Sequence, residues 1–502
     1  MANDGISVAT KISDGLPGDI LLDQAFTRIT GAPATAGNKI ELLRDARENY
    51  PAWLKAIAGA RTSIHFESYI IHDDDAGRQF ADAMKAKAAE GVQVRVLYDW
   101  WGDVGATRRR FWRDLKNAGV DVRCFNPPHL DSPFGWVSRD HRKSIVVDGR
   151  IAFVSGMCVG NDWVGDPSKG IEPWRDTGVS LEGPAVADVD HAFAKTWAMA
   201  GSPLPPGEIA RRPPGPASTE GTVVRVVATQ PSAAGLFRLD QVVAAAAQRS
   251  LWLTDAYFVA VTSYVQALCA AANDGIDVRL LVPMGSDVPG FRALSRSGYR
   301  PLLEAGVKVF EWDGPMLHAK TAVADGRWAR VGSTNLNLTS WLGNWELDVA
   351  VEDEAFARKM EAMYEDDLKH ATEVVLSARR RVQAVSPKAG RSRPARQGSR
   401  RSAAAGAFGV GSTIGAAITN HRLLGPAEAR LLGAVGALLI VVAGAIAWWP
   451  KVAAVPLAVL TAWIALSLLL KASKLHRTGR VQSRAARHAA AKAALVGERT
   501  KT

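Results

Sequence analysis

One ten-residue pattern occurs twice in the sequence, and this repetition constrains the fold more than any other feature. HRKSIVVDGR occupies 141–150 and HAKTAVADGR occupies 318–327, at an offset of 177 residues. Upstream of the two copies, TSIHFESYII (62–71) resembles RSLWLTDAYFVA (249–260). Self-similarity at a fixed offset is typical of an internal duplication. The chain is therefore predicted to fold as two similar halves.

Both copies lie in the same succession of helical and strand patterns. Helices that alternate with buried, β-rich strands are typical of an α/β fold. We therefore expect an N-terminal segment (1–44), a first α/β half (45–201), a Pro/Gly-rich linker (202–221) and a second, similar α/β half (222–376). The expected helices are 50–60, 76–90, 235–248 and 261–274, and the strands that follow the second helix of each half are 92–100 and 276–284.

The repeated segment has the pattern of a strand, a turn and a second strand. Successive side chains of a strand point to opposite faces, so His141 and Lys143 share one face. The same spacing places His318 and Lys320 on one face in the second copy. The Asp-Gly pair that follows is a hairpin-turn signal. Each copy is therefore expected to direct an imidazole and an ammonium group into the same space.

Two imidazoles and two ammonium groups suit the cleavage of a phosphodiester. Lysine cations can hold the phosphate oxygens, one neutral histidine can attack phosphorus, and the other can protonate the leaving alkoxide. Each imidazole needs an acceptor that fixes its tautomer. Asp176, 35 residues after His141, and Glu346, 28 residues after His318, are expected to orient the histidines that they follow.

These residues resemble the signature of the phospholipase D superfamily, His-x-Lys-x4-Asp-x6-Gly-Ser-x-Asn. The first copy departs from it, because Ser155–Gly156 replaces Gly-Ser and Cys158 stands in place of the asparagine. The segments WRDTGVSLEGPAV (174–186) and NWELDVAVED (344–353) further resemble bacterial cardiolipin synthases. The second copy matches the signature throughout, with His318, Lys320, Asp325, Gly332, Ser333 and Asn335.

The resemblance implies two α/β halves that share one active site at their interface and use no metal or other cofactor. It implies that His141 is the nucleophile, which forms a covalent phosphohistidine, and that His318 is the general acid/base. The substrates would be anionic glycerophospholipids. The remaining implied site residues are the catalytic Lys143 and Lys320, Asp148 and Asp325 in supporting roles near the turns, and the phosphate-binding Ser155, Ser333 and Asn335.

The net charge is distributed unevenly along the chain. Residues 1–378 carry a net charge of −8, although the whole chain carries +11. A net acidic catalytic part disfavours a polyanionic substrate, so no nucleic-acid partner is expected. The three cysteines are widely spaced and predict neither a disulfide framework nor a metal site.

Two uncharged apolar runs near the C-terminus predict a membrane anchor. Residues 431–449 and 452–470 each extend over 19 residues, close to the roughly 20 that a spanning helix needs. We expect a two-helix transmembrane hairpin at 431–470, between a basic linker with a possible interfacial helix (377–430) and a basic tail (471–502). The basic flanks favour a cytoplasmic location for both ends, and for the catalytic part, at the cell membrane. The alternative interpretation is a buried helical pair in a soluble domain.

Three activities fit this set of residues. The favoured one is phosphatidyl transfer of the cardiolipin synthase type, with an alcohol such as phosphatidylglycerol as acceptor. Hydrolysis, as in phospholipase D, differs only in that water is the acceptor. A membrane-tethered nuclease would use the same histidines but would need a basic groove. One aromatic cluster is interpreted either as a lipid-facing lip of the site or as core packing: Trp100, Trp101, Phe111 and Trp112.

Overall fold

The computed structural model describes most of the chain up to residue 384 and little beyond it. The described residues are 17–129, 137–212, 221–376 and 382–384, together with isolated helical positions between 440 and 466. Apart from those positions, the predicted hairpin at 431–470 lies outside the described residues, as do the basic tail and nearly all of the basic linker. Over the described part of the chain, no helix combines the length and the apolar character needed to cross a bilayer.

The chain divides into two compact units. One consists of Met1–Asn126 and Ser138–Glu428, and the other of Pro127–Val137 and Ala429–Thr502. Both copies of the repeat lie in the first unit, to which the rest of this description applies.

Each half contributes seven strands to one sheet, in the same order. The first-half strands are β1 (Thr35–Arg44), β2 (Ser63–Ser68), β3 (Gln93–Asp99), β4 (Asp121–Phe125), β5 (Lys143–Val147), β6 (Ile151–Ser155) and β7 (Thr177–Glu182). The second-half strands are β8 (Thr222–Thr229), β9 (Ser250–Thr254), β10 (Asp277–Pro283), β11 (Lys308–Trp312), β12 (Thr321–Ala324), β13 (Trp328–Gly332) and β14 (Glu346–Glu352), extended by β15 (Ala371–Leu376) and β16 (Val382–Ala384).

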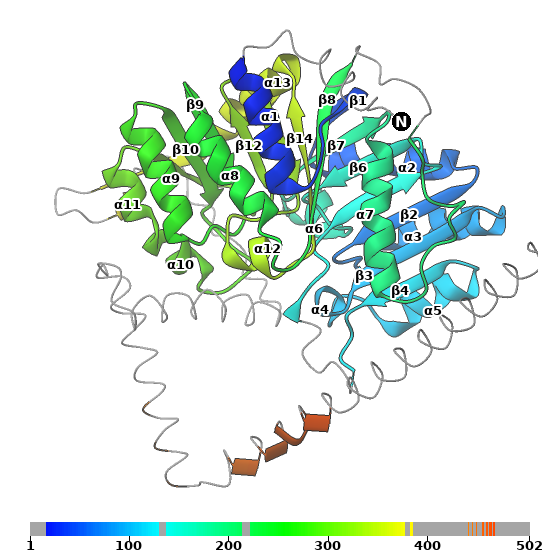
Figure 1. The fold of residues 1–502 in the computed structure, drawn as a ribbon. Coiled ribbons are helices and arrows are strands. Elements are labelled where there is room, and N and C mark those ends of the chain that lie inside the picture. The colour runs from blue at the N-terminus through cyan, green and yellow to red at the C-terminus, as the bar shows by residue number, and fades with distance from the viewer. Residues whose placement is uncertain are drawn as a thin grey trace, which may run out of the picture. The chain divides into compact units, whose positions relative to one another are not determined.

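The strand order identifies a pseudo-twofold arrangement. From the centre outward the first half runs β1, β7, β6, β5, β2, β3 and β4, and the second runs β8, β14, β13, β12, β9, β10 and β11. β1 and β8 pair in antiparallel orientation, so the sheet continues from one half into the other (Figure 1). The segment before residue 45 therefore supplies β1, the strand of the first half that adjoins the second half.

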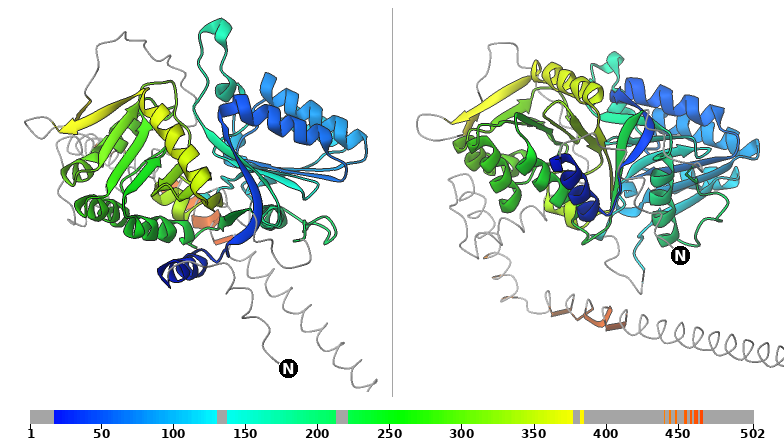
Figure 2. Two further views of the ribbon diagram at one scale, coloured as in Figure 1. Left: turned by 90° about the horizontal axis from the view of Figure 1, so that it is seen from above. Right: turned by 45° about the horizontal axis from the view of Figure 1, so that its top comes forward.

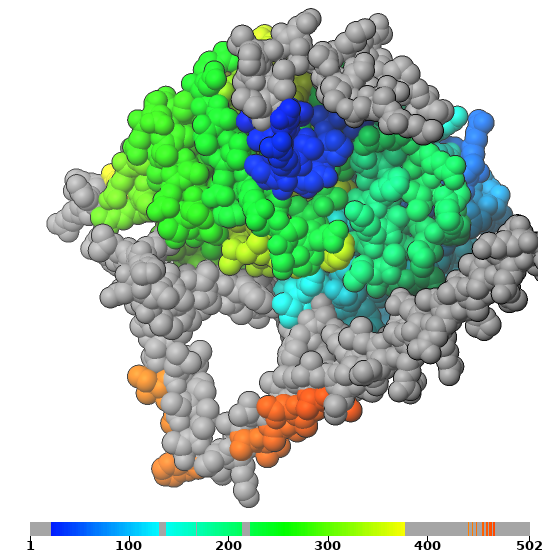
Figure 3. Space-filling model, in the orientation of Figure 1, coloured from blue at the N-terminus to red at the C-terminus, as the bar shows by residue number. Residues whose placement is uncertain are grey.

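Helices cover both faces of the sheet in each half. In the first half they are α2 (Asp45–Gly59), α3 (Asp75–Ala89), α4 (Trp100–Asp103), α5 (Arg109–Asn117), α6 (Asn161–Val164), the 3-10 turn η3 (Pro167–Lys169) and α7 (Val186–Met199). In the second half they are α8 (Gly235–Ala246), α9 (Thr262–Asn273), α10 (Phe291–Ser297), α11 (Tyr299–Glu304), α12 (Leu338–Leu342) and α13 (Glu354–Leu368). The N-terminal α1 (Pro17–Thr30) packs on α8 and forms the blue patch beside the green second half in Figure 3.

Three hydrophobic clusters correspond to the layers. The blue helices α2 and α3 pack over one face of the first half (Figure 2), around Phe80 and Ile145. The helices α8 and α9 pack in the same way on the second half, around Leu253. A central cluster includes Val146 from β5 and Val323 from β12, together with residues of α7 and α13. Because one core contains residues of both halves, docking of the halves is part of folding rather than a later association.

The two repeated hairpins turn at their Asp-Gly pairs. Asp148 and Gly149 have φ angles of 53° and 61°, and Asp325 and Gly326 have 55° and 65°. Two consecutive left-handed residues define the tight turn whose twist matches that of the flanking strands. The turn fixes the register of each hairpin, and with it the direction in which the preceding His-x-Lys segment points.

Candidate active site

The two histidines lie just before β5 and β12, and each is held by the backbone of the opposite half. The His141 amide donates to the Trp345 carbonyl oxygen at 2.9 Å, and the His318 amide donates to the Arg175 carbonyl oxygen at 2.7 Å. Both imidazoles are almost entirely buried. The repeated backbone contact brings the two copies of the motif to one place at the junction of the halves.

The orienting carboxylates are exchanged between the halves. His141 Nδ1 lies 2.9 Å from Glu346 Oε2, and His318 Nδ1 lies 2.7 Å from Asp176 Oδ2. The expectation that each acid orients the histidine preceding it in the sequence is therefore wrong about the pairing, although both acids do contact a histidine. The reason is that the segments leading into β7 and β14 cross to the opposite half, where they pair with the chain next to the histidines.

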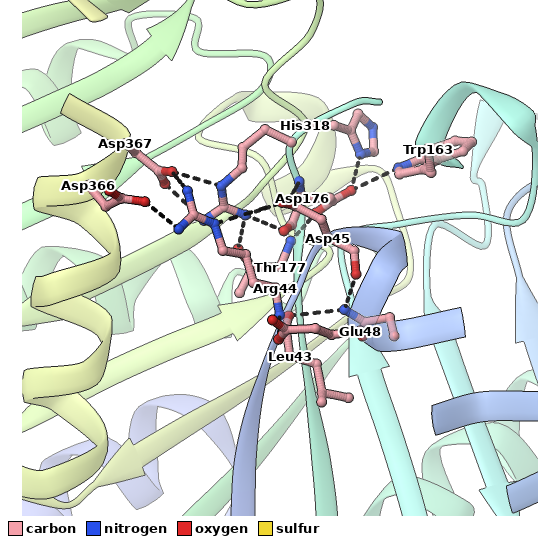
Figure 4. A network of polar contacts seen from close by, with 12 residues as sticks. Leu43, Arg44, Asp45, Glu48, Trp163, Asp176, Thr177, His318, Asp366 and Asp367 are labelled. Carbon is pink, nitrogen blue, oxygen red and sulfur yellow. Dashed lines mark hydrogen bonds and ion pairs between the residues drawn. The ribbon is translucent and has the colours of Figure 1, made fainter. Parts of the chain in front are cut away.

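Each carboxylate has a second hydrogen-bond donor, but the donors differ between the halves. Glu346 Oε2 accepts from the Ser333 hydroxyl at 2.6 Å. Asp176 Oδ2 accepts from the Trp163 indole at 3.1 Å. Figure 4 shows the Asp176 carboxylate between Trp163 and His318. Gly156 occupies the place equivalent to Ser333, and a Cβ there would lie 2.4 Å from Asp176 Oδ1. The departure of the first copy from Gly-Ser thus leaves room for the carboxylate, while an indole supplies the missing donor.

The backbone around Asp176 is fixed by ion pairs that join the halves. Arg175 is buried and pairs with Asp45 at 3.1 Å and with Asp367 of α13 at 2.8 Å. Asp45 also accepts from the Asp176 amide at 3.0 Å, and Arg44 pairs with Asp367 at 2.9 Å (Figure 4). This network holds the strand that carries the His318 carboxylate against the second half.

The two motif lysines are buried beside the histidines. The ammonium groups of Lys143 and Lys320 donate to the carbonyl oxygens of His141 and His318, respectively. Lys320 Nζ also lies 2.9 Å from His318 Nδ1. Burial lowers the pKa of Lys320 to about 8. Two ammonium groups at this place can stabilise an anionic oxygen between the imidazoles.

The electrostatic environments of the two histidines differ. Burial, followed by the charges of Lys143 and Lys320, holds the pKa of His141 well below its ordinary value. Burial and Lys320 lower the pKa of His318 to about 4, but Asp176 opposes this shift. Burial raises the pKa of Glu346 to about 6. Burial would also raise the pKa of Asp176, yet His318, Lys320 and the Thr177 amide together outweigh it, and the pKa lies below its ordinary value. Both imidazoles are thus held neutral, and only His318 has a carboxylate that opposes the shift of its pKa.

Aromatic rings surround the histidines. Tyr69 packs edge-on against His141, with ring centroids 4.9 Å apart. Tyr257, the equivalent residue, lies 5.8 Å from His318, and Trp163 and Trp174 lie 5.6 Å and 5.7 Å from the same ring. The His318 imidazole is therefore enclosed by three aromatic rings and is buried.

The aromatic cluster noted in the sequence divides into two pairs. Phe111 and Trp112 are buried, and Trp112 stacks on Tyr98 with ring centroids 3.9 Å apart, which is core packing. Trp100 and Trp101 are only partly buried.

Other residues implied by the resemblance have other contacts. The Asp148 carboxylate accepts hydrogen bonds from the backbone amides of 61–63, and Asp325 does the same for 248–250. Both join a hairpin turn to the start of a neighbouring strand. The Ser155 hydroxyl donates to the Met157 carbonyl oxygen at 3.3 Å. By contrast, Asn335 Oδ1 is buried with no hydrogen-bond partner in the described part of the chain.

Sequence reasoning missed Trp163. It lies in α6 at a place that the repeat does not cover, and no motif distinguishes it from the chain's other tryptophans. Within the described ranges, no three His, Cys, Asp or Glu side chains are grouped as a metal site would require.

The fold and the site together define a class: enzymes in which two similar α/β halves each supply a His-Lys pair to one buried centre. Comparison with known proteins agrees. A family model described as "Cardiolipin synthase, PLD-like domain" matches residues 53–162 and 243–368. The sequence is 35% identical over 361 residues to cardiolipin synthase A of Pseudomonas fluorescens, covering 70% of this chain and 73% of that protein. It is 33% identical over 341 residues to the probable cardiolipin synthase YwiE of Bacillus subtilis, covering 66% and 67%.

A solved structure shares the fold. The phosphatidylserine synthase of Haemophilus influenzae superposes with a TM-score of 0.55 at 17% identity, covering 70% of this chain and 91% of that one. The chain is an enzyme of the phospholipase D superfamily and belongs to its cardiolipin synthase-like family.

Proposed function

We propose that this enzyme transfers the phosphatidyl group of an anionic glycerophospholipid to an alcohol, namely a second phosphatidylglycerol, and so forms cardiolipin. The observation that carries the proposal is the exchanged pair of histidine–carboxylate contacts, 2.9 Å at His141 and 2.7 Å at His318. With Nδ1 of each ring held by a carboxylate, each Nε2 is the atom left for chemistry. The relatives that carry the name cardiolipin synthase support the choice of substrate.

In the first step, His141 Nε2 attacks phosphorus and an N–P bond forms as the bond to the leaving alkoxide breaks. His318, protonated at Nε2, gives its proton to that alkoxide. In the second step His318 takes a proton from the acceptor hydroxyl, whose oxygen then displaces His141 and restores the free enzyme. The low pKa of His141 keeps it neutral for attack. The pKa of His318 is also low, about 4, so this imidazole would gain its proton when the bound phosphate anion offsets the charges of the lysines, and the ionised Asp176 stabilises that protonated form.

Lys143, Lys320 and Asn335 would hold the non-bridging oxygens of the phosphate. The lysines contribute positive charge at the place where the transition state concentrates negative charge. The Asn335 amide would hold a phosphate oxygen by donating from Nδ2, since its Oδ1 can only accept; Oδ1 has no partner in the described part of the chain and would suit a hydroxyl of the lipid. In this assignment Ser333 acts through Glu346, while Asp148, Asp325 and Ser155 support the hairpins.

A membrane-embedded substrate requires the site to work at a bilayer. We propose that 431–470 forms the anchoring hairpin and that the catalytic part faces the cytoplasm. The two uncharged 19-residue runs and their basic flanks support this assignment. Removal of 402–502 is expected to abolish turnover on vesicles while leaving turnover of a dispersed short-chain phosphatidylglycerol. Full activity of the truncated chain on vesicles would contradict the anchor.

Product analysis tests the reaction itself. The full chain is incubated with phosphatidylglycerol vesicles, with His141→Ala as the inactive control, and the lipids are separated. Cardiolipin together with free glycerol is the expected outcome. Phosphatidic acid as the sole product would replace the transferase by a hydrolase, and the absence of any lipid turnover alongside DNA cleavage would indicate a nuclease.

A further inference from the structure

Asp45 has a backbone conformation that residues other than glycine seldom adopt. It lies where β1 ends and α2 begins, and its φ angle is 57°, in the left-handed region. Aspartate tolerates this region better than most side chains, but the conformation persists only where surrounding contacts hold it. The contacts of Asp45 therefore indicate what this residue does.

Three contacts of Asp45 go to two consecutive residues, Arg175 and Asp176. The Asp45 amide donates to the Asp176 carbonyl oxygen at 3.0 Å, and Asp45 Oδ1 accepts from the Asp176 amide at 3.0 Å (Figure 4). The same Oδ1 accepts from Arg175 Nη1 at 3.1 Å. Both backbone polar groups of Asp176 are thus bound by one residue, and these contacts hold its left-handed conformation.

The two residues that Asp45 binds enclose His318. The Arg175 amide donates to the Met316 carbonyl oxygen at 2.9 Å, and the Arg175 carbonyl oxygen accepts from the His318 amide at 2.7 Å. Asp176 Oδ2 lies 2.7 Å from His318 Nδ1. The hydrogen bonds of Asp45 therefore reach His318 through Arg175 and Asp176.

The carboxylate on the other histidine is held differently. Thr229 faces Glu346 in the β8–β14 register, as Asp45 faces Asp176 one residue beyond the end of the β1–β7 register. The Thr229 hydroxyl has no hydrogen-bond partner among the described residues. The Glu346 carboxylate instead accepts from the Ser333 hydroxyl at 2.6 Å. The side-chain clamp on the backbone therefore occurs in one half and the serine donor in the other.

Asp176 depends on its backbone for two reasons. Gly156 occupies the place of Ser333, so the corresponding hydroxyl donor is missing. Aspartate also has one rotatable bond fewer than glutamate between its backbone and its carboxylate, so a shift of the backbone moves the carboxylate directly. A shift of about an ångström would lengthen the bond to His318 beyond hydrogen-bond range.

We propose that Asp45 is a positioning residue for the steps in which His318 transfers a proton: it holds the Asp176 backbone where the carboxylate meets the imidazole. The inference rests on the proposed function, in which His318 is the general acid. Loss of the Asp45 carboxylate then slows the steps that need a proton from His318 and spares attack by His141. A merely structural residue would affect both alike.

The test compares first turnovers of the full chain with phosphatidylglycerol, whose leaving alkoxide needs a proton, and with phosphatidyl-p-nitrophenol, whose leaving group does not. Asp45→Gly keeps the left-handed backbone and removes the carboxylate. Its rate is expected to fall about 10- to 100-fold with phosphatidylglycerol and to stay within about threefold with phosphatidyl-p-nitrophenol. Asp45→Asn keeps an oxygen for the Asp176 amide and is expected to recover most of the loss. Both rates come from one preparation, so their ratio does not depend on the folded fraction.

Ser232→Gly is the matched control. Ser232 is also left-handed, with a φ angle of 68°, and its side chain is exposed in the connection between β8 and α8. Both rates are expected to stay unchanged in this variant. The pH profile gives a second readout: burial and Lys320 lower the pKa of His318 and Asp176 opposes them, so a displaced Asp176 should move the alkaline limb with phosphatidylglycerol to lower pH in Asp45→Gly.

Equal losses with both donors and an unmoved limb in Asp45→Gly would overturn the proposal, as would an Asp45→Asn variant no faster than Asp45→Gly. Asp176→Asn separates this failure from a failure of the proposed function. If Asp176→Asn also loses the same rate with both donors, His318 is not the general acid and the proposed mechanism fails. If Asp176→Asn discriminates between the donors and Asp45→Gly does not, the assignment of Asp45 alone is wrong.

Discussion

The exchange of carboxylates predicts which step each acid serves. Asp176 supports His318, the proposed general acid, so Asp176→Asn is expected to impair protonation of the leaving alkoxide. Glu346 supports His141, the proposed nucleophile, so Glu346→Gln is expected to impair attack on phosphorus. The amide in each variant can still accept a hydrogen bond, so geometry is retained and only the charge is removed.

The expected losses follow from the contacts. Each carboxylate makes a short bond to a buried imidazole, and a hydrogen bond to a charged group contributes about 2 kcal/mol, or roughly 30-fold in rate. For Asp176→Asn the loss extends toward the 100-fold or more that general acid catalysis typically supplies. Both variants should therefore be slow with phosphatidylglycerol, and this substrate alone does not separate the roles.

A substrate with a good leaving group separates them. Release of p-nitrophenolate needs no proton, so the first turnover of phosphatidyl-p-nitrophenol should be within about threefold of wild type in Asp176→Asn. Glu346→Gln should remain roughly 30-fold slow with the same substrate, because attack by His141 is still required. Stopped-flow measurement of the first-turnover burst excludes the second step. Glu354→Gln, at an exposed carboxylate of α13, is the control. Rescue of Glu346→Gln instead of Asp176→Asn would refute the assignment of roles across the halves.

Three further outcomes are expected. Trp163→Phe removes a donor from Asp176, so the first-turnover rate should fall about tenfold and the alkaline limb of its pH profile should move to higher pH, because His318, the proposed general acid, becomes more basic; a lower rate with an unmoved limb would indicate packing alone. The burst rate should decrease at pH values below about 6, because burial raises the pKa of Glu346 to about 6 and its carboxylate is protonated there. The Glu346→Gln variant should not show this decrease. Asp148→Ala should lower stability by about 1–2 kcal/mol with the activity of the folded enzyme unchanged, as measured by thermal unfolding. Burial would raise the pKa of Asp148, but the amides of Ser63 and Thr62 outweigh it and lower the pKa; this stabilisation is therefore present above about pH 4, and the difference from wild type should shrink as the pH falls further.

Much of the fold was predictable because its helices, strands and turns follow from patterns within short segments of the repeat. The expected helix at 76–90 corresponds to α3 (Asp75–Ala89), and the expected strand at 92–100 corresponds to β3 (Gln93–Asp99). The turn at Asp148 follows from its Asp-Gly dipeptide, which favours two left-handed residues. Hydrophobic period and turn chemistry are properties of short segments, so one sequence is enough to show them.

The pairing of the acids was not predictable in this way. Asp176 follows His141 in the sequence, yet it bonds His318, because the choice of partner depends on how the halves dock. Trp163 was missed for a related reason: its indole replaces the Ser333 hydroxyl, and no spacing rule connects an indole in a short helix with a serine at a strand end. The sequence showed that Ser155–Gly156 departs from the Gly-Ser of the signature, but not that a side chain at Gly156 would collide with the Asp176 carboxylate.

The exchanged acids also explain why so many contacts join the two halves. A histidine oriented by its own half would need only a rough association between the halves to form a working pair. Here the tautomer of each histidine depends on a carboxylate from across the junction, so an error of about an ångström in docking would break both contacts at once. The antiparallel β1–β8 pair, the central core of α7 and α13, and the buried ion pair of Arg175 with Asp367 all restrict that docking. In the proposed mechanism these structural contacts therefore determine the geometry of the reaction, and the two histidines would become competent only when the whole duplicated unit has folded.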